Sequence, residues 1–268
     1  MAHLEGKVAV VTGAGGVLCS VMSKALAEHG ARVALLDVKV DAAERVAEEI
    51  RGQGGEALAV AADVLSRESL EGARQKIHEA FGLVEILING AGGNRPQATA
   101  SPEQSFFDIP AEAIQWVFNL NCLGTILPCQ VFVRDMIQLQ HGVVINITSM
   151  AAIRPLTRVV AYGAAKAAVA NFTQWLAVHL AQNYTPKIRV NAIAPGFFLT
   201  EQNRYLLVDG AGNPTPRGQT ILAHTPAGRY GEPADLLSTL LWLVDEQSSF
   251  VTGAIIPVDG GFSAFAGV

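Results

Sequence analysis

A strand, a glycine-rich turn and a helix open the chain in that order, and this order restricts the fold more than any other feature. Lys7-Val-Ala-Val-Val11 is a short apolar run typical of a buried parallel strand. Thr12-Gly-Ala-Gly-Gly-Val-Leu-Cys19 follows, and an amphipathic stretch then runs to His29-Gly30. This arrangement directs backbone N–H groups and a helix N-terminus toward a pyrophosphate. We therefore expect a dinucleotide site with contacts from Gly13, Gly15, Gly16, Val17 and Leu18.

The next apolar run ends in an acid that bears on the choice of dinucleotide. Arg32-Val-Ala-Leu-Leu-Asp37 is a second strand, and Asp37 follows Gly13 at about the spacing where a carboxylate meets the adenosine ribose. There it would accept hydrogen bonds from the ribose hydroxyls and repel a 2′-phosphate. Lys39 is the one nearby cation that opposes this interpretation, and a plain strand-end cap is the alternative role for Asp37. The pattern favours NAD over NADP.

Further strands alternate with helices, which indicates an α/β fold with a parallel sheet. They are expected at Ala57–Ala61, Glu85–Ile88, Val143–Ile147 and Ile188–Ile193. Ligands of such sheets bind at the carboxyl ends of the strands. Residues that follow the third and fourth strands are therefore further cofactor candidates: Asp63, Val64, Asn89, Gly90 and Ala91.

A tyrosine and a lysine four residues apart are the best candidates for acid–base chemistry. Tyr162-Gly-Ala-Ala-Lys166 opens an alanine-rich helix that runs toward Asn183, and positions four apart share one helix face. A neighbouring cation lowers the pKa of a phenol, which can then exchange a proton with an alcohol oxygen. Ser149, after the fifth strand, can hold that oxygen. Asn121 lies inside a helix expected from Ala111 to Leu139, where a buried amide needs a partner or a function.

These features resemble the short-chain dehydrogenase/reductase family over essentially the whole chain. The motifs that occur in family order are Thr12-Gly13, Asp37, Asp63-Val64, Asn89-Gly-Ala-Gly92, Asn121, Ser149, Tyr162-x-x-x-Lys166, Pro195-Gly196, Thr200, Arg229-x-Gly-Glu-Pro233 and Val258-Asp-Gly-Gly261. The resemblance implies a Rossmann, doubly wound, parallel seven-stranded sheet with helices on both faces, in a single domain of residues 1–268. It implies that residues 1–110 mainly bind the dinucleotide and that 111–268 carry catalysis and the substrate.

The resemblance also implies roles for particular residues. Asn121, Ser149, Tyr162 and Lys166 would form the catalytic tetrad. Lys166 and Tyr162 would also contact the cofactor, and Asn121 would hold a water that links Lys166 to solvent. The cofactor would also meet Pro195, Gly196, Phe198 and Thr200, with the backbone of Phe198 at the carboxamide.

The glycine turn departs from the family pattern at two positions. Val17 and Cys19 stand where the family has glycines, whereas Gly13 is retained. We expect Val17 to crowd the pyrophosphate and Cys19 to be small enough for helix–strand packing.

A narrower resemblance points to the D-mannonate oxidoreductase (fructuronate reductase) branch of the family. The segments that carry it are Ile88–Asn94, Phe118–Asn121, Asn171–His179, Ala194–Asn203 and Ile221–Thr225. It implies that a ketone of D-fructuronate is reduced with NADH to D-mannonate, with Tyr162 as the proton donor. Other polyols, gluconate-type acids, 3-oxoacyl substrates and a nucleotide-sensing protein without turnover are the alternatives.

A sugar acid needs a cation for its carboxylate, and arginine binds carboxylates through two hydrogen bonds. Arg95 and Arg154 are the preferred candidates, ahead of Arg158 and Arg204, because both follow the sheet edge. The candidates for the sugar hydroxyls are Asn94 and Gln202. We expect the segment at about 197–225 to be a lid, since its centre is rich in glycine and proline. A structural role is favoured for His224.

Composition argues against several other classes of function. The net charge is −5 and no basic tract is present, which argues against nucleic acid and anionic membranes as partners. No apolar run of about 18 residues and no signal-peptide layout is evident. The three cysteines lack metal-ligand spacing, so we expect reduced thiols in a cytoplasmic protein and no metal site. By family analogy we expect a homotetramer or homodimer.

Overall fold

Seven parallel strands form the centre of the molecule, in the order β3-β2-β1-β4-β5-β6-β7. The computed structural model describes residues 2–200 and 204–267. The strands are β1 (Val8–Thr12), β2 (Arg32–Asp37), β3 (Glu56–Ala61), β4 (Ile86–Asn89), β5 (Gly142–Ile147), β6 (Ile188–Pro195) and β7 (Ile255–Val258). The strand order reverses between β1 and β4, which is where doubly wound sheets bind their ligands. The predicted Rossmann fold is confirmed.

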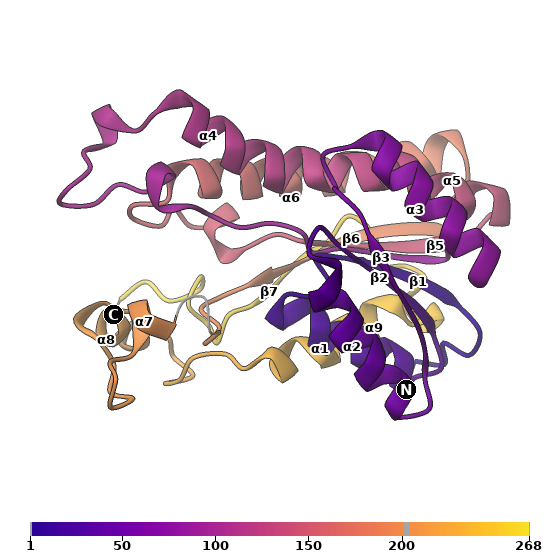
Figure 1. Cartoon of the computed structure of the whole chain (residues 1–268). Coiled ribbons are helices and arrows are strands. Elements are labelled where there is room, and N and C mark those ends of the chain that lie inside the picture. Colours follow the sequence, from indigo (N-terminus) through magenta and orange to yellow (C-terminus); the bar gives the residue numbers. More distant parts are fainter. Residues whose placement is uncertain (1, 201–203, 268) are drawn as a thin grey trace.

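Helices cover both faces of the sheet (Figure 1). The helices α3 (Arg67–Ala80), α4 (Ala111–Phe118), α5 (Gly124–Leu139) and α6 (Val160–Asn183) lie on one side, and α1 (Val17–Glu28), α2 (Val40–Gly52) and α9 (Leu237–Val244) on the other. Two short helices, α7 (Arg204–Leu207) and α8 (Pro216–Ala223), lie beyond the carboxyl edge of the sheet.

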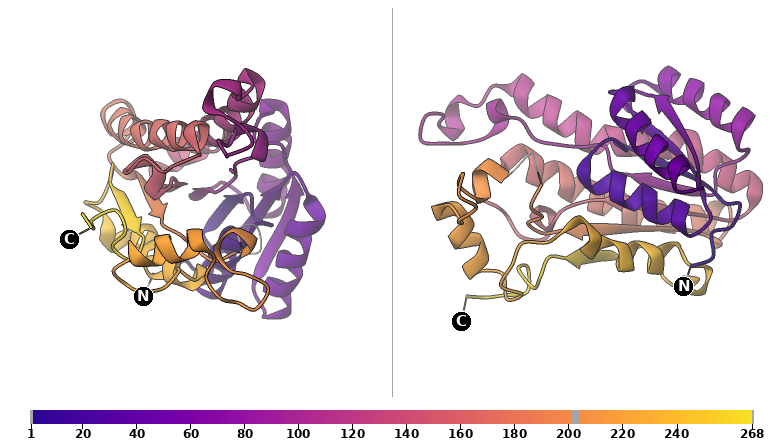
Figure 2. Two further views of the ribbon diagram at one scale, coloured as in Figure 1. Left: turned by 90° about the vertical axis from the view of Figure 1, so that its left-hand side faces the viewer. Right: turned by 60° about the horizontal axis from the view of Figure 1, so that its bottom comes forward.

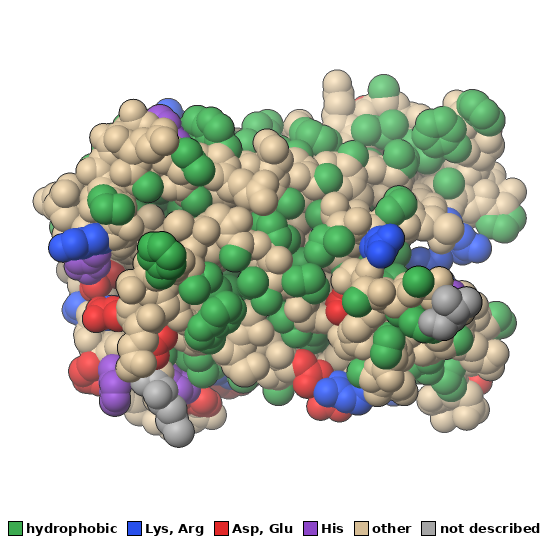
Figure 3. Space-filling view, turned by 180° about the vertical axis from the view of Figure 1, so that it is seen from behind, with side chains coloured by type: hydrophobic (Ala, Val, Ile, Leu, Met, Phe, Trp, Pro, Cys, Tyr) green, Lys and Arg blue, Asp and Glu red, His purple; other side chains and the backbone are tan. Residues whose placement is uncertain are grey.

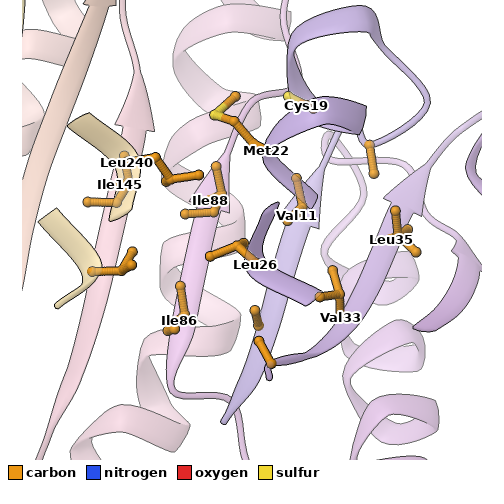
Figure 4. Close-up of a cluster of buried hydrophobic side chains, with 14 of the residues drawn as sticks. Val11, Cys19, Met22, Leu26, Val33, Leu35, Ile86, Ile88, Ile145 and Leu240 are labelled. Atoms are coloured by element: carbon orange, nitrogen blue, oxygen red, sulfur yellow. The ribbon is translucent and has the colours of Figure 1, made fainter. Parts of the chain in front are cut away.

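Alternate residues of the strands feed two separate hydrophobic cores. In β1, Ala9 and Val11 belong to the core beneath α1, whereas Val8 and Val10 belong to the core beneath α3 and α5. Figure 4 shows the first core, in which Met22 and Leu26 of α1 pack on the strands. Because both faces are buried, the central strands are uninterrupted apolar runs rather than alternating ones.

The helix predicted over residues 111–139 is continuous but contains one wide turn. The segment η3 (Asn119–Leu123) has π-helical geometry between α4 and α5. Such an inserted turn is common at functional sites, and here it contains Asn121. By length and composition Ala111–Leu139 could cross a membrane, contrary to the expectation from the sequence, but 56% of its most apolar window is buried inside the protein. We therefore interpret it as a core helix of this fold.

The predicted lid segment is more ordered in secondary structure than its glycine and proline content suggests. It contains α7 and α8, and Val208 pairs with Pro214 between them. His224, at the end of α8, lies 6.5 Å from the ring of Phe262 and 6.3 Å from that of Phe265, centroid to centroid. The segment is thus held against the C-terminal tail, which supports the structural role expected for His224.

Candidate active site

Thr12 joins the two glycine turns at the reversal of the strand order. Its Oγ1 accepts hydrogen bonds from the backbone N–H groups of Gly90 (3.1 Å) and Ala91 (3.2 Å). Gly13 has a φ of +65°, and a methyl group on it would lie 2.8 Å from Cα of Ala91. Only glycine satisfies both the left-handed backbone and this close approach. The sequence named Thr12 only as part of the family motif Thr12-Gly13 and, of these two, predicted a cofactor contact for Gly13 alone, because the hydrogen bonds of the Thr12 side chain are visible only in the tertiary structure.

The first turn of α1 has the properties of an anion-binding site. Gly16 is its N-cap and provides no side chain, and no acidic residue lies in the first turn. The unpaired N–H groups and the helix dipole at this end favour negative charge. Val17 is the first residue of the helix and is half-buried. The predicted pyrophosphate site therefore has a suitable backbone despite the altered glycine pattern.

Asp37 lies directly beside this turn. One carboxylate oxygen accepts a hydrogen bond from the N–H of Gly15 at 3.0 Å, and the other accepts one from the N–H of Lys39 at 2.9 Å. A methyl group on Gly15 would lie 2.5 Å from Cβ of Ala42 and 3.1 Å from the carboxylate of Asp37. The absence of a side chain at position 15 is what lets the carboxylate reach the turn.

Cys19 occupies space that the second glycine turn leaves open. Its side chain is buried, and burial raises the pKa of its thiol to about 12. The thiol is therefore protonated and acts as a small apolar group. A methyl group on Gly90 would lie only 2.1 Å from Sγ of Cys19, so the sulfur takes up the space that a side chain at position 90 would need. The expected packing role of Cys19 agrees with this geometry.

Three other cofactor candidates have side chains with structural partners. Asn89 is buried, and its side-chain N–H groups donate to Oδ1 of Asn146 (2.8 Å) and Sγ of Cys129 (3.1 Å). Val64 is buried, and a methyl group on Gly124 would lie 2.9 Å from its Cγ2. Asp63 is exposed and accepts from the N–H of Leu65. The side chains of Asn89 and Val64 are thus held in the core, and the contacts of these two residues with the cofactor stay predictions.

Ser149, Tyr162 and Lys166 come together where β5 ends and α6 begins. The Lys166 ammonium donates to the carbonyl of Ile147 at 2.8 Å and lies 5.7 Å from the centroid of the Tyr162 ring. The hydroxyl of Thr148 donates to the carbonyl of Lys166 at 2.8 Å, which ties the helix to the strand end. Ser149 accepts from the N–H of Ala151 at 3.1 Å, and this bond caps the short turn after β5.

The electrostatics of this group differ from the expectation in one respect. Burial raises the pKa of Tyr162, and a hydrogen bond with Ser149 is what lowers it. Burial also lowers the pKa of Lys166 to about 8. Burial thus outweighs the effect of Ser149 on the pKa of Tyr162, and the predicted lowering of that pKa by Lys166 stays a prediction. The physical reason is desolvation, which disfavours the charged form of both groups.

The side chain of Asn121 holds the second glycine turn in place through hydrogen bonds. Its side chain accepts from the N–H of Gly93 (3.1 Å) and donates to the carbonyls of Gly93 and Val117 (both 2.7 Å). A methyl group on Gly92 would lie 2.7 Å from Oδ1 of Asn121 and 3.2 Å from Nζ of Lys166. The amide is fully buried and satisfied, and it lies next to the ammonium. This accounts for a polar residue in the π turn.

The end of β6 is anchored to the C-terminal tail. The N–H of Gly196, the residue after Pro195, donates to the carbonyl of Val258 at 2.9 Å. A methyl group on Gly196 would lie 2.6 Å from Cβ of Asp259. Phe198 is buried and pairs with Gly231, and Thr200 is half-buried. This places 195–200 at the same sheet edge as the other candidates.

The preferred substrate candidates have partners within the protein. Arg95 stacks on Trp116, with its guanidinium carbon 4.7 Å from the ring centroid. Arg154 donates to the carbonyl of Ser263 at 2.9 Å, and Asn94 donates to Oγ1 of Thr99 at 3.0 Å. Gln202 lies outside the described residues. The structure therefore gives little support to Arg95 or Arg154 as carboxylate ligands.

Comparisons with known proteins agree with this geometry. A model of the short chain dehydrogenase family matches residues 7–209. The chain is 50% identical over 277 residues to an uncharacterized oxidoreductase of Haemophilus influenzae, which covers 99% of this chain and 96% of that protein. It is also 50% identical over 275 residues to the uncharacterized oxidoreductase UxuB of Bacillus subtilis, covering 99% of this chain and 98% of the relative.

Solved structures extend the comparison to bound ligands. A Haemophilus protein provisionally called a D-mannonate oxidoreductase, with bound NAD, has a TM-score of 0.94 at 50% identity and covers 100% of this chain and 98% of its own. A gluconate 5-dehydrogenase from Burkholderia cenocepacia, in complex with NADP and tartrate, has a TM-score of 0.87 at 29% identity and covers 98% of each chain.

Proposed function

The chain belongs to the short-chain dehydrogenase family, and from this premise we propose that it interconverts D-fructuronate and D-mannonate with NAD(H). The family assignment makes it an oxidoreductase that acts on alcohols and ketones. The observation that carries the proposal is the convergence of Ser149, Tyr162 and Lys166 beside the two glycine turns. The choice of substrate is supported by the 50% identity to the NAD-bound Haemophilus protein.

The described residues fit a dinucleotide. A methyl group at Gly13 or Gly15 would collide with the backbone or with Ala42, so this cradle requires glycine for close approach. The uncapped N-terminus of α1 suits the pyrophosphate. The carboxylate of Asp37 suits a ribose with free hydroxyls and disfavours a 2′-phosphate, which supports NAD over NADP.

The side chains of this group supply proton transfer and orientation. The nicotinamide, when bound, supplies the hydride for the ketone carbon. Tyr162 gives its phenolic proton to the ketone oxygen during reduction and takes the proton from the alcohol in the reverse direction. Ser149 holds the same oxygen and lowers the pKa of Tyr162. Lys166 and Asn121 lie side by side behind Gly92, and this placement supports a proton path through them to solvent.

The proposal extends to the organisation of the chain. Residues 1–110 would mainly bind the dinucleotide, 111–268 would carry catalysis and substrate, and 197–225 would act as the lid. We also expect a cytoplasmic homotetramer or homodimer. The three free, buried cysteines are consistent with a reducing compartment.

A substrate panel tests the function. Purified protein would be assayed by NADH absorbance with D-fructuronate, 5-keto-D-gluconate, a neutral ketohexose and a 3-oxoacyl thioester, and the panel would be repeated with NADPH. D-Fructuronate with NADH should give the highest kcat/KM. A clear preference for 5-keto-D-gluconate, the acid suggested by the gluconate 5-dehydrogenase likeness, would replace the proposed substrate.

A catalytic variant separates turnover from binding. Tyr162→Phe removes only the phenolic hydroxyl, so turnover should fall by about a thousandfold or more whereas NADH binding, measured by fluorescence titration, stays nearly unchanged. Normal turnover in this variant would refute the role of Tyr162. Absence of turnover in the wild type, with NADH bound, would favour a nucleotide-sensing protein.

A further inference from the structure

Arg158 has an unusual backbone at a position close to the candidate catalytic group. Its φ is +75°, and among the described residues only Gln140 and Arg158 are non-glycine residues with positive φ. Gln140 terminates α5, a common place for this conformation, but Arg158 lies in the loop before α6. The N–H of Ala100 donates to the carbonyl of Arg158 at 2.9 Å and holds the loop in place. Strained residues of this kind cluster at functional sites.

The C-terminal tail brings this loop and α8 to the same place. Arg154 binds the carbonyl of Ser263, and His224 at the end of α8 contacts the rings of Phe262 and Phe265. The view along the sheet in Figure 2 (left) shows α8 on the opposite side of the carboxyl edge from α4 and α6. In Figure 3 the surface is hollowed between these two parts, and Lys or Arg side chains line the recess.

Arg217 projects from the first turn of α8. Thr215 caps this helix by accepting from the N–H of Gly218 at 3.0 Å, and a methyl group on Gly218 would lie 2.1 Å from the carbonyl oxygen of Leu207. The backbone that carries Arg217 is therefore rigidly packed. The side chain is half-buried, and the pKa of Arg217 is lowered first by burial and second by the charge of Arg158.

The two guanidiniums lack an anionic partner in the described parts of the chain. Neither forms an ion pair or a side-chain hydrogen bond within residues 2–200 and 204–267. The pKa of Glu103 is lowered mainly by its hydrogen bond with Ser101 and least by Arg158, and no ion pair joins Glu103 to Arg158. Arg158 is exposed and Arg217 is half-buried, and the charge of Arg158 acts on Arg217. Two like charges near each other are unfavourable unless an anion joins them.

We propose that Arg158 and Arg217 bind the carboxylate of the substrate and so select sugar acids over neutral polyols. The proposal rests on the proposed function and assigns the acid-binding end of that site. Two guanidiniums can hold one carboxylate through several charge-assisted hydrogen bonds. Arg158 precedes Tyr162 by one helical turn of sequence. In an open-chain hexuronate the carboxylate lies at the far end of the chain from the ketone, so the group that binds the carboxylate must lie apart from the Tyr162 hydroxyl.

Single substitutions test the pair against the arginines that have other partners. Arg158→Gln and Arg217→Gln should each raise KM for D-fructuronate about 10- to 100-fold and change kcat only about twofold, because a charged hydrogen bond to the substrate is lost. The matched controls, Arg95→Gln and Arg154→Gln, should change KM less than about threefold. Turnover of a neutral ketohexose should be unaffected in all four variants. Unchanged KM in both test variants would overturn the proposal.

A glycine variant separates binding from folding. Arg158→Gly relieves the left-handed strain, so its melting temperature should equal or exceed that of the wild type while KM still rises. If Arg158 had only a structural role, Arg158→Gly would leave KM unchanged.

A binding measurement keeps this test independent of turnover. Calorimetric titration of D-mannonate into the NAD-loaded proteins should give a Kd about 10- to 100-fold weaker for Arg158→Gln and for Arg217→Gln than for the wild type. If the wild type turns over no sugar acid but shows this pattern, the proposed function falls and the carboxylate site stands. If all three bind D-mannonate equally, the carboxylate site falls whatever the activity.

Discussion

The sulfur of Cys19 fills the space above Gly90, where a methyl group would lie 2.1 Å from Sγ and 3.7 Å from Cβ of Cys19. Cys19 replaces a glycine of the family pattern, and the glycine at position 90 is what accommodates it. The first helix can thus pack on the second glycine turn without displacing either.

This relationship predicts strong coupling between the two positions. Gly90→Ala should destabilise the protein by about 1–3 kcal/mol through overpacking, and Cys19→Ala by about 1 kcal/mol through lost burial. In the double variant the new methyl group occupies the place of the sulfur, so the cost should be less than the sum of the two. Urea unfolding of the four proteins measures the coupling. Strictly additive values would contradict the contact.

Ser149 should set the pH range of alcohol oxidation. Oxidation of D-mannonate needs Tyr162 in its deprotonated form, and the hydrogen bond with Ser149 lowers a pKa that burial raises. Ser149→Ala removes this bond, so the rising limb of the pH–rate profile should move to higher pH and kcat should fall about 10- to 1000-fold. Ser238→Ala, on the exposed side of α9, is the control. A limb that stays in place would show that Ser149 does not tune Tyr162.

Asp37 should decide between the two dinucleotides. Asp37→Asn keeps an oxygen acceptor beside Gly15 but removes the charge that repels a 2′-phosphate. The ratio of kcat/KM for NAD to that for NADP should fall by at least about tenfold. Asp63→Asn is the matched control, since the carboxylate of Asp63 accepts from Leu65 rather than from the glycine turn and its loss should affect both dinucleotides equally. An unchanged ratio in Asp37→Asn would leave the strand-end cap as the role of this residue.

Lys166 should reduce the stability of the ligand-free protein at neutral pH. Burial lowers its pKa from 10.5 to about 8, so the native state binds its proton less tightly than the unfolded state. The cost is present in full below pH 8 and disappears as the pH rises from 8 toward 10.5. Lys166→Met should therefore be inactive yet more stable at pH 7 by up to about 3 kcal/mol, and this advantage should shrink above pH 8.

Urea unfolding at several pH values measures the effect of Lys166→Met. Lys76→Met, on the exposed face of α3, is the control and should run parallel to the wild type. A stability difference between Lys166→Met and the wild type that stays constant from pH 7 to 10.5 would exclude the depressed pKa of Lys166 as its cause.

Local patterns along the chain were sufficient to predict much of this protein. Short apolar runs located the strands, because burial on both faces demands continuous apolar residues. The glycine turn and Asp37 were recognisable because their function depends on short spacings along the chain. Tyr162 and Lys166 were recognisable for the same reason, because they lie within about one helical turn of each other. The family resemblance supplied the seventh strand and the set of four catalytic candidates.

Other properties depend on residues that are distant in sequence. Asn89 forms a hydrogen bond with Asn146, and Asn121 forms one with Gly93. Arg95 stacks on Trp116. None of these partners can be predicted from spacing along the chain. The pKa of Tyr162 is raised rather than lowered because desolvation depends on everything packed around the phenol. The sequence by itself determined which elements form and which chemistry they carry, since both follow from neighbours along the chain. Only the tertiary structure decided which side chains remain free to meet a ligand, because packing and loss of water are set by the whole fold.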